Sequence, residues 1–137
     1  MATKKKKSLR KTTVYKLFYR DKLGRLISWS PPNNCRQVYD ATRINKPLIR
    51  NSYIFVFSDA TYANQFDKFS GKDRVVFECE ATGVNRRRKF RVHITEDLDA
   101  VEKFWRHGKI DWLKLRPLES GMLLCKTLRL IRPVDLA

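Results

Sequence analysis

The sequence has few of the residues that mark collagen-like, low-complexity or membrane-spanning chains. It contains five Gly and five Pro in 137 residues, too few for a collagen-like or Gly/Pro-rich chain. No apolar run reaches the roughly 18 residues that a membrane-spanning helix needs. The basic start of the chain is not followed by the apolar core of a signal peptide. We therefore expect an intracellular protein without a membrane partner.

Motifs that hold metals or nucleotide phosphates are also missing. The three cysteines, Cys35, Cys79 and Cys125, are far apart and form no CxxC pair. The two histidines are His93 and His107, whereas a structural zinc site needs four ligands at recognisable spacings. Neither GxxxxGK[ST] nor GxGxxG occurs. We expect no metal and no cofactor, and we expect the cysteines in apolar segments to be buried thiols.

Positive charge is the strongest feature that is present. The chain has 30 Lys and Arg against 14 Asp and Glu, for a formal net charge of +16. Residues 1–25 contain ten basic residues and one acidic residue, whereas residues 92–137 contain eight and seven. A second basic cluster lies at residues 86–91. The excess is therefore concentrated in an N-terminal arm and one internal cluster.

Both clusters suggest contact with a polyanion. A basic block such as Lys4–Lys7 stays extended until an anion neutralises it, and lysines on phosphates release counterions. We expect Arg86–Arg88 at the tip of a β-hairpin, where guanidinium groups can pair bidentately with phosphate oxygens. The alternatives are a solubilising or targeting tail and a solvated hairpin tip. The predicted nucleic-acid-binding residues are Lys4, Lys5, Lys6, Lys7, Arg10, Lys11, Lys16, Arg20, Arg25, Arg86, Arg87, Arg88, Lys89 and Arg91.

The pattern of apolar residues predicts a sheet with short helices. The segment 13–20 alternates between two faces, which is typical of a strand, and DKLG at 21–24 predicts a turn into a returning strand at 25–30. Further strands are predicted at 35–41, 51–58, 73–81, 89–95 and 121–134.

Two helices are predicted between these strands. Ser58 is the expected N-cap of the first, which places Tyr62 on a buried stripe and runs to about Phe69. Thr95 is the expected cap of the second, which ends near Gly108. The sequence therefore predicts a flexible basic arm (1–12) and a single α+β domain (13–137). Its sheet is mostly antiparallel and twisted, with six to seven strands and two short helices.

Other residues have both a chemical and a structural interpretation. Glu78 and Glu80 share one strand face, where two carboxylates can divide acid and base roles, although a solvated strand face is commoner. Tyr15, Tyr19 and Trp29 interleave with cations and would suit unpaired bases, although such residues more often pack a sheet face.

Two resemblances add further expectations. The segments YIFVFSDATYANQF and VVFECEATG, with the terminal GMLLCKTLRLI, resemble small uncharacterised proteins of bacteriophages and viruses over about residues 13–132. This resemblance implies a viral or mobile-element origin, an accessory role and the cytoplasm of a host cell. It covers none of the basic arm.

The second resemblance concerns single residues in order along the chain. Arg20, then Ser58 with Thr61, then Glu78-Cys79-Glu80, are similar to the Arg…Ser-Thr…Glu-x-Glu order of ADP-ribosyltransferases. That resemblance implies NAD as cofactor, with Arg20 on the dinucleotide phosphates, Ser58 ordering the site and Glu80 on the nicotinamide ribose.

Our leading hypothesis from the sequence is a non-catalytic nucleic-acid-binding accessory protein of viral origin. RNA or a nucleoprotein complex is favoured over free duplex DNA because interleaved aromatic residues suit unpaired bases. The enzyme alternative is an ADP-ribosyltransferase-like protein. The third is a virion or host-complex protein that binds an acidic protein surface.

Overall fold

The fold is organised around one long central strand, β1 (Thr12–Arg20). The computed structural model describes residues 10–28, 37–47, 53–65, 73–86, 90–93, 114–118 and 121–135. One edge of β1 pairs with β6 (Arg74–Thr82) over eight positions, from Thr12↔Ala81 to Tyr19↔Arg74. The other edge pairs first with β5 (Ile54–Phe57) and then with β2 (Leu26–Ser28). Both edges of β1 are therefore used.

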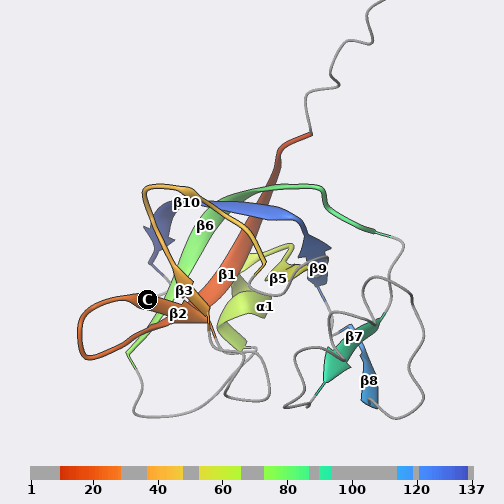
Figure 1. The fold of residues 1–137 in the computed structure, drawn as a ribbon, viewed down its shortest axis with the longest axis horizontal. Helices are drawn as coiled ribbons and strands as arrows, with labels where there is room; N and C mark the ends of the chain where they lie inside the picture. Colours follow the sequence, from red (N-terminus) through yellow and green to blue (C-terminus); the bar gives the residue numbers. More distant parts are fainter. Residues whose placement is uncertain are drawn as a thin grey trace, which may run out of the picture.

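The remaining strands continue the sheet in both directions until it is nearly barrel-shaped (Figure 1). Strand β3 (Gln37–Tyr39) pairs with β2, and β9 (Met122–Cys125) pairs with β5. Strand β10 (Thr127–Val134) pairs with β6, and β4 (Ile44–Asn45) pairs with β10. Every pairing among the described residues is antiparallel, as the sequence predicted.

A separate pair, β7 (Phe90–His93) and β8 (Lys114–Pro117), forms a second, two-stranded sheet. The sequence predicted that the strand at 89–95 returns along the strand at 73–81. That hairpin is wrong, because β6 pairs with β1 and β10 while β7 pairs with β8. The cluster at 86–91 is therefore not the tip of a two-stranded ribbon.

The predicted final strand at 121–134 is two strands rather than one. The chain changes partners at Lys126, so β9 lies beside β5 and β10 lies beside β6. A β-bulge follows within β10, where the register shifts between Leu130 and Arg132 and Ile131 is exposed. An apolar run alone cannot reveal such a change of partner, because each half keeps the composition of a strand.

Both faces of β1 are buried, which explains why its apolar alternation is so strong. Val14 and Phe18 face the barrel interior, where the Phe18 ring contacts Tyr39 and Phe77 edge to face, at 5.0 and 5.7 Å between centroids. Leu17 and Tyr19 face outward into a second apolar cluster, which the helix covers with Ala63. The core thus has an inside layer and a layer beneath the helix.

The helix α1 (Ala60–Gln65) follows β5 directly. Its cap is Asp59 rather than the predicted Ser58, because the Tyr62 backbone N–H donates to Asp59 Oδ1 at 3.1 Å. Ala63 is its buried residue, whereas Tyr62, expected on the buried stripe, is 41% exposed. The predicted end at Phe69 and the second predicted helix lie outside the described residues.

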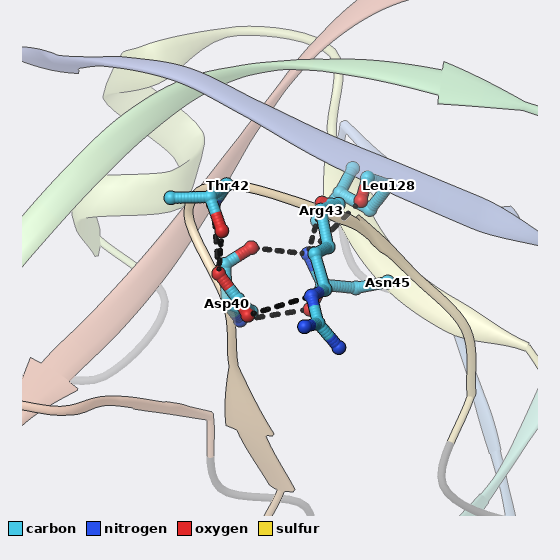
Figure 2. A network of polar contacts seen from close by, with 5 residues as sticks. All are labelled: Asp40, Thr42, Arg43, Asn45 and Leu128. Atoms are coloured by element: carbon cyan, nitrogen blue, oxygen red, sulfur yellow. Dashed lines mark hydrogen bonds and ion pairs between the residues drawn. The ribbon is translucent and has the colours of Figure 1, made fainter.

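A buried asparagine attaches the turn between β3 and β4 to the sheet (Figure 2). Asn45 Nδ2 donates to the carbonyls of Asp40, Arg43 and Leu128, at 2.9, 3.1 and 3.2 Å. Its Oδ1 accepts the Asp40 backbone N–H at 2.8 Å. One 8% exposed side chain therefore closes the turn and holds it against β10.

We expect Asn45→Ala to lower the free energy of unfolding by about 2 kcal/mol, because buried carbonyls and an N–H lose their partner. Urea denaturation followed by circular dichroism measures this change. Thr42→Val is the matched control in the same turn, since the exposed Thr42 hydroxyl bonds only Asp40 Oδ1 among the described residues. Equal losses in the two variants would show that Asn45 does not hold the turn.

Candidate nucleic-acid interface

The N-terminal basic arm joins the barrel at the end where β1 begins. Arg10 and Lys11 immediately precede β1 and are exposed. Lys11 Nζ lies 3.6 Å from Glu80 Oε1, on the adjacent strand β6. The side chain of Lys11 remains 64% exposed in this ion pair, so the pair leaves the ammonium accessible. Lys4–Lys7 lie outside the described residues.

The strand that precedes the second basic cluster, β6, ends beside the start of β1, and three further residues separate its end from Arg86. After β6 the chain is held by Asn85, whose backbone N–H donates to the Leu124 carbonyl at 2.8 Å. Asn85 Nδ2 also donates to the Tyr53 hydroxyl at 3.0 Å. Arg86 follows this anchored residue and is exposed. Arg87, Arg88, Lys89 and the side chain of Arg91 lie outside the described residues.

Two cations that the sequence did not single out, Lys46 and Lys126, also lie at this end. Lys46 follows β4, whose last residue Asn45 pairs with Leu128 near the start of β10. Lys126 separates β9 from β10, and its backbone N–H donates to the Thr82 carbonyl at 3.0 Å. Lys126 could have been identified from the sequence only by predicting that the strand pairing changes at this residue. The sequence predicted a continuous strand there instead.

Two other predicted contact residues, Arg20 and Arg25, lie at the opposite end of β1. Arg20 ends the strand, about 23 Å from the level of Thr13 at roughly 3.3 Å per residue. Arg25 Nε donates to Asp21 Oδ2 at 2.6 Å across the hairpin turn. Desolvation opposes ionised Asp21, but hydrogen bonds from Arg25 and Leu23 outweigh it and lower the pKa of this carboxyl. Arg25 is thus already engaged by a carboxylate.

Lys16 was predicted to contact nucleic acid, and this prediction is wrong for the conformation described. Its side chain points into the barrel and is 1% exposed. Its Nζ donates to the Phe55 carbonyl at 2.7 Å and lies 3.6 Å from the centroid of the Phe55 ring. Alternation along β1 placed Lys16 on the face of Val14 and Phe18, and that whole face is interior.

The surroundings of Lys16 are apolar and contain two thiols. Burial lowers the pKa of Lys16 from 10.5 to about 7. Burial likewise raises the pKa of Cys79 and of Cys125 from 9.0 to about 12, so both thiols stay protonated at neutral pH. A protonated thiol is a poor nucleophile and a poor metal ligand. The described residues contain no cluster of His, Cys, Asp and Glu that could hold a metal ion.

The residues of the enzyme alternative do not converge. Glu80 pairs with Thr13 near the start of β1, whereas Arg20 ends that strand. Ser58 lies beyond the end of β5, where its backbone N–H donates to the Gly121 carbonyl at 2.7 Å. A dinucleotide site needs these groups around one ligand, whereas Arg20 lies at the far end of β1 from Glu80.

The carboxylates on β6 have separate cationic partners. Glu80 lies beside Lys11, and Glu78 Oε1 accepts from Arg132 Nη2 at 3.2 Å. Both glutamates are partly exposed on the outer sheet face, which agrees with the structural interpretation of this pair. Of the aromatic residues proposed to stack on bases, Tyr19 is buried, Tyr15 is half-buried and Trp29 lies outside the described residues.

The lowered pKa of Lys16 makes the stability of the barrel depend on pH. Between pH 7 and 10.5 the unfolded chain binds the lysine proton more tightly than the folded chain does. The free energy of unfolding therefore rises with pH in this window, by about 1 kcal/mol from pH 7 to pH 8. Near pH 9 the thiols begin to oppose this rise, because they ionise first in the unfolded chain.

We expect Lys16→Met to abolish the rise between pH 7 and 8 while keeping the fold, because an apolar side chain replaces a buried amine. Urea titrations at about pH 7, 7.5 and 8 measure the free energy of unfolding across this rise. Lys22→Met, in the exposed turn after β1, serves as the control and should keep the wild-type slope. A Lys16→Met variant with an unchanged slope would contradict the assignment.

Comparisons with known proteins give no relative from which a function can be transferred. No family model matches the chain, and neither a curated protein nor a solved structure matches it. In the part of the chain that the structure describes, no helix has the length and apolar character to cross a membrane.

Proposed function

We propose that the chain is a non-catalytic nucleic-acid-binding protein that holds backbone phosphates with its basic arm and the segment that begins at Arg86. The observation that supports this proposal is that β1, which follows the arm, begins beside the end of β6, which precedes Arg86 (Figure 1). Thr12 at the start of β1 pairs with Ala81 near the end of β6. Following the bacteriophage resemblance, we propose an accessory role in the cytoplasm of an infected cell.

The distribution of carboxylates supports the same end of the barrel. Asp21, Asp73 and Asp135 lie next to the opposite ends of β1, β6 and β10, whereas Asp59 follows β5, whose last residue Phe57 pairs with Tyr15 in the first half of β1. Within two residues of the start of β1 and the end of β6, Glu80 is the one carboxylate among the described residues. A polyanion that approaches the barrel is therefore attracted to this end and repelled less there than elsewhere.

A binding role fits the site better than ADP-ribosyl transfer does. Arg20 lies about 23 Å along β1 from the level of Glu80, whereas phosphate contacts need only accessible cations on a rigid support. An acidic protein surface would bind to the same cations. The two partners differ in their response to nuclease, which the following experiment uses.

We expect the full chain to bind single-stranded RNA with an affinity that falls steeply as salt rises, because each neutralised phosphate releases counterions. Replacing Lys4, Lys5, Lys6 and Lys7 by Gln should reduce the slope of log K against log salt by up to about 3, or 0.7 per phosphate contact. Fluorescence anisotropy with labelled RNA at several salt concentrations measures both quantities. The control variant, Arg20→Gln with Lys22→Gln, removes charge at the opposite end and should change the slope little.

Two results would contradict the proposal. One is weak binding at low salt, or binding that does not depend on salt. The other is a protein partner that co-purifies from cell lysate and remains attached after nuclease treatment, because this would favour the acidic-protein alternative.

A further inference from the structure

The outer face of β10 and β4 brings two cations together. Arg129 in β10 is exposed, follows the buried Leu128 and lies directly opposite Ile44 in β4. Lys46, two residues after Ile44, is exposed as well. A residue that precedes a proline favours extended backbone, so Lys46, before Pro47, continues the alternation of β4 and faces the same side as Ile44. Arg129 and Lys46 are therefore diagonal neighbours, which in a sheet lie about 7–8 Å apart, within reach of two long side chains.

Neither of these two cations has a carboxylate partner among the described residues. No described carboxylate forms an ion pair with Arg129 or with Lys46. Glu80 lies directly opposite Arg129 on β6, but its Oε1 contacts Lys11 Nζ at 3.6 Å. Glu80 is thus one carboxylate beside three cations. This part of the outer face therefore carries an excess of positive charge, and its cations repel one another across adjacent strands.

Among the described residues, Asp40 is the other carboxylate close to β4, and it has partners of its own (Figure 2). Its backbone N–H and carbonyl are bonded to the Asn45 side chain. Its Oδ1 accepts the backbone N–H and the hydroxyl of Thr42, at 2.8 and 2.6 Å, and its Oδ2 lies 3.6 Å from Arg43 Nε. The hydrogen bonds from Thr42 lower the pKa of Asp40, so this carboxyl is ionised at neutral pH. Its charge is balanced by Arg43, within the turn that precedes β4.

A pair of hydroxyl groups lies beside the two cations. Thr127, two residues before Arg129, lies on the same face of β10. Extending the register of β4 and β10 by one residue places Lys46 opposite Thr127. The Thr127 hydroxyl shares a hydrogen bond with the hydroxyl of Thr82 on β6. That bond uses one of the two hydroxyl protons, so the other remains for an oxyanion.

An exposed apolar side chain next to these donors indicates what kind of anion fits. Ile44 is 64% exposed and lies directly opposite Arg129. Burying this surface adds nothing for a bare inorganic anion, whereas a nucleotide carries a sugar and a base beside its phosphate. The arginine fork pairs bidentately with phosphate oxygens, and a lysine adds a point charge. The combination favours a phosphate within a nucleic-acid strand over a free phosphate ion.

We infer that Arg129 and Lys46, together with the Thr127 hydroxyl, bind one backbone phosphate of a nucleic-acid strand on the outer face of β10 and β4. This inference rests on the proposed function and adds to it a contact site on the sheet itself. Arg129 belongs to residues 92–137, in which eight basic residues stand against seven acidic ones. Charge counts therefore gave no reason to expect a binding residue there.

The double variant Lys46→Gln with Arg129→Gln tests the inference. Fluorescence anisotropy with a labelled single-stranded RNA of about 10 nucleotides, at several salt concentrations, measures the affinity and its salt slope. The variant should bind about tenfold more weakly, with a slope lower by about 0.7, the value for one phosphate contact. The matched control is Arg43→Gln with Arg132→Gln, which removes two exposed arginines that already contact carboxylates. This control should change the affinity by less than about twofold.

A second variant separates the loss of charge from any change of fold. Lys46→Arg with Arg129→Lys keeps both charges and should retain the wild-type salt slope, with a modest loss of affinity because the arginine fork has moved. Far-ultraviolet circular dichroism of each variant should match that of the full chain, since both residues are exposed.

Four results would overturn this site. Unchanged affinity in the Lys46→Gln, Arg129→Gln variant would do so, as would an equal loss in the Arg43→Gln, Arg132→Gln control, because then only the total charge matters. Inorganic phosphate that competes as well as unlabelled RNA at equal ionic strength would assign the site to a free anion. A poly-glutamate peptide that binds the full chain more tightly than the RNA does would assign it to an acidic protein. Absence of salt-dependent RNA binding by the full chain would instead overturn the proposed function itself.

Discussion

The double-sided pairing of β1 is the constraint on which the rest of the structure depends. One edge of this strand is occupied by β6 over eight positions and the other by β5 and β2, so its side chains enter two cores at once. The strand therefore cannot shift by one residue without exchanging its two faces. The same register places Lys11 outside at the end of the barrel and Lys16 inside, although both belong to one basic stretch of sequence.

The burial of Lys16 in the interior is energetically unfavourable. A buried ammonium loses its hydration, and one carbonyl with nearby aromatic faces replaces only part of it. The barrel therefore favours the neutral amine, and it surrounds this amine with thiols that stay neutral as well. Lys16, Cys79 and Cys125 in the interior are thus mostly uncharged at slightly alkaline pH.

The sequence predicted local features well, but it predicted poorly which strands pair with one another. The alternation of segment 13–20 and the turn before Arg25 predicted β1 and its hairpin, because side-chain direction and turn chemistry are properties of neighbouring residues. The hairpin around Arg86 was wrong because pairing depends on distant strands. The exposure of Arg10 and Lys11 was predictable from charge alone, whereas the positions of Lys16, Lys46 and Lys126 required the three-dimensional arrangement. Charge counts cannot distinguish an interior lysine from an exterior one.

The bulge in β10 has a consequence for behaviour at high concentration. A regular edge strand offers a row of N–H and C=O groups to which a second copy can add. Among the described residues, β10 has β4 as its second neighbour only at Leu128 and Arg129, and beyond them the row is interrupted, because Ile131 bulges outward and Pro133 has no N–H to donate. A protein that lines up along a long polyanion brings many copies into close proximity. An irregular edge of this kind keeps such crowded neighbours from joining sheet to sheet into insoluble aggregates.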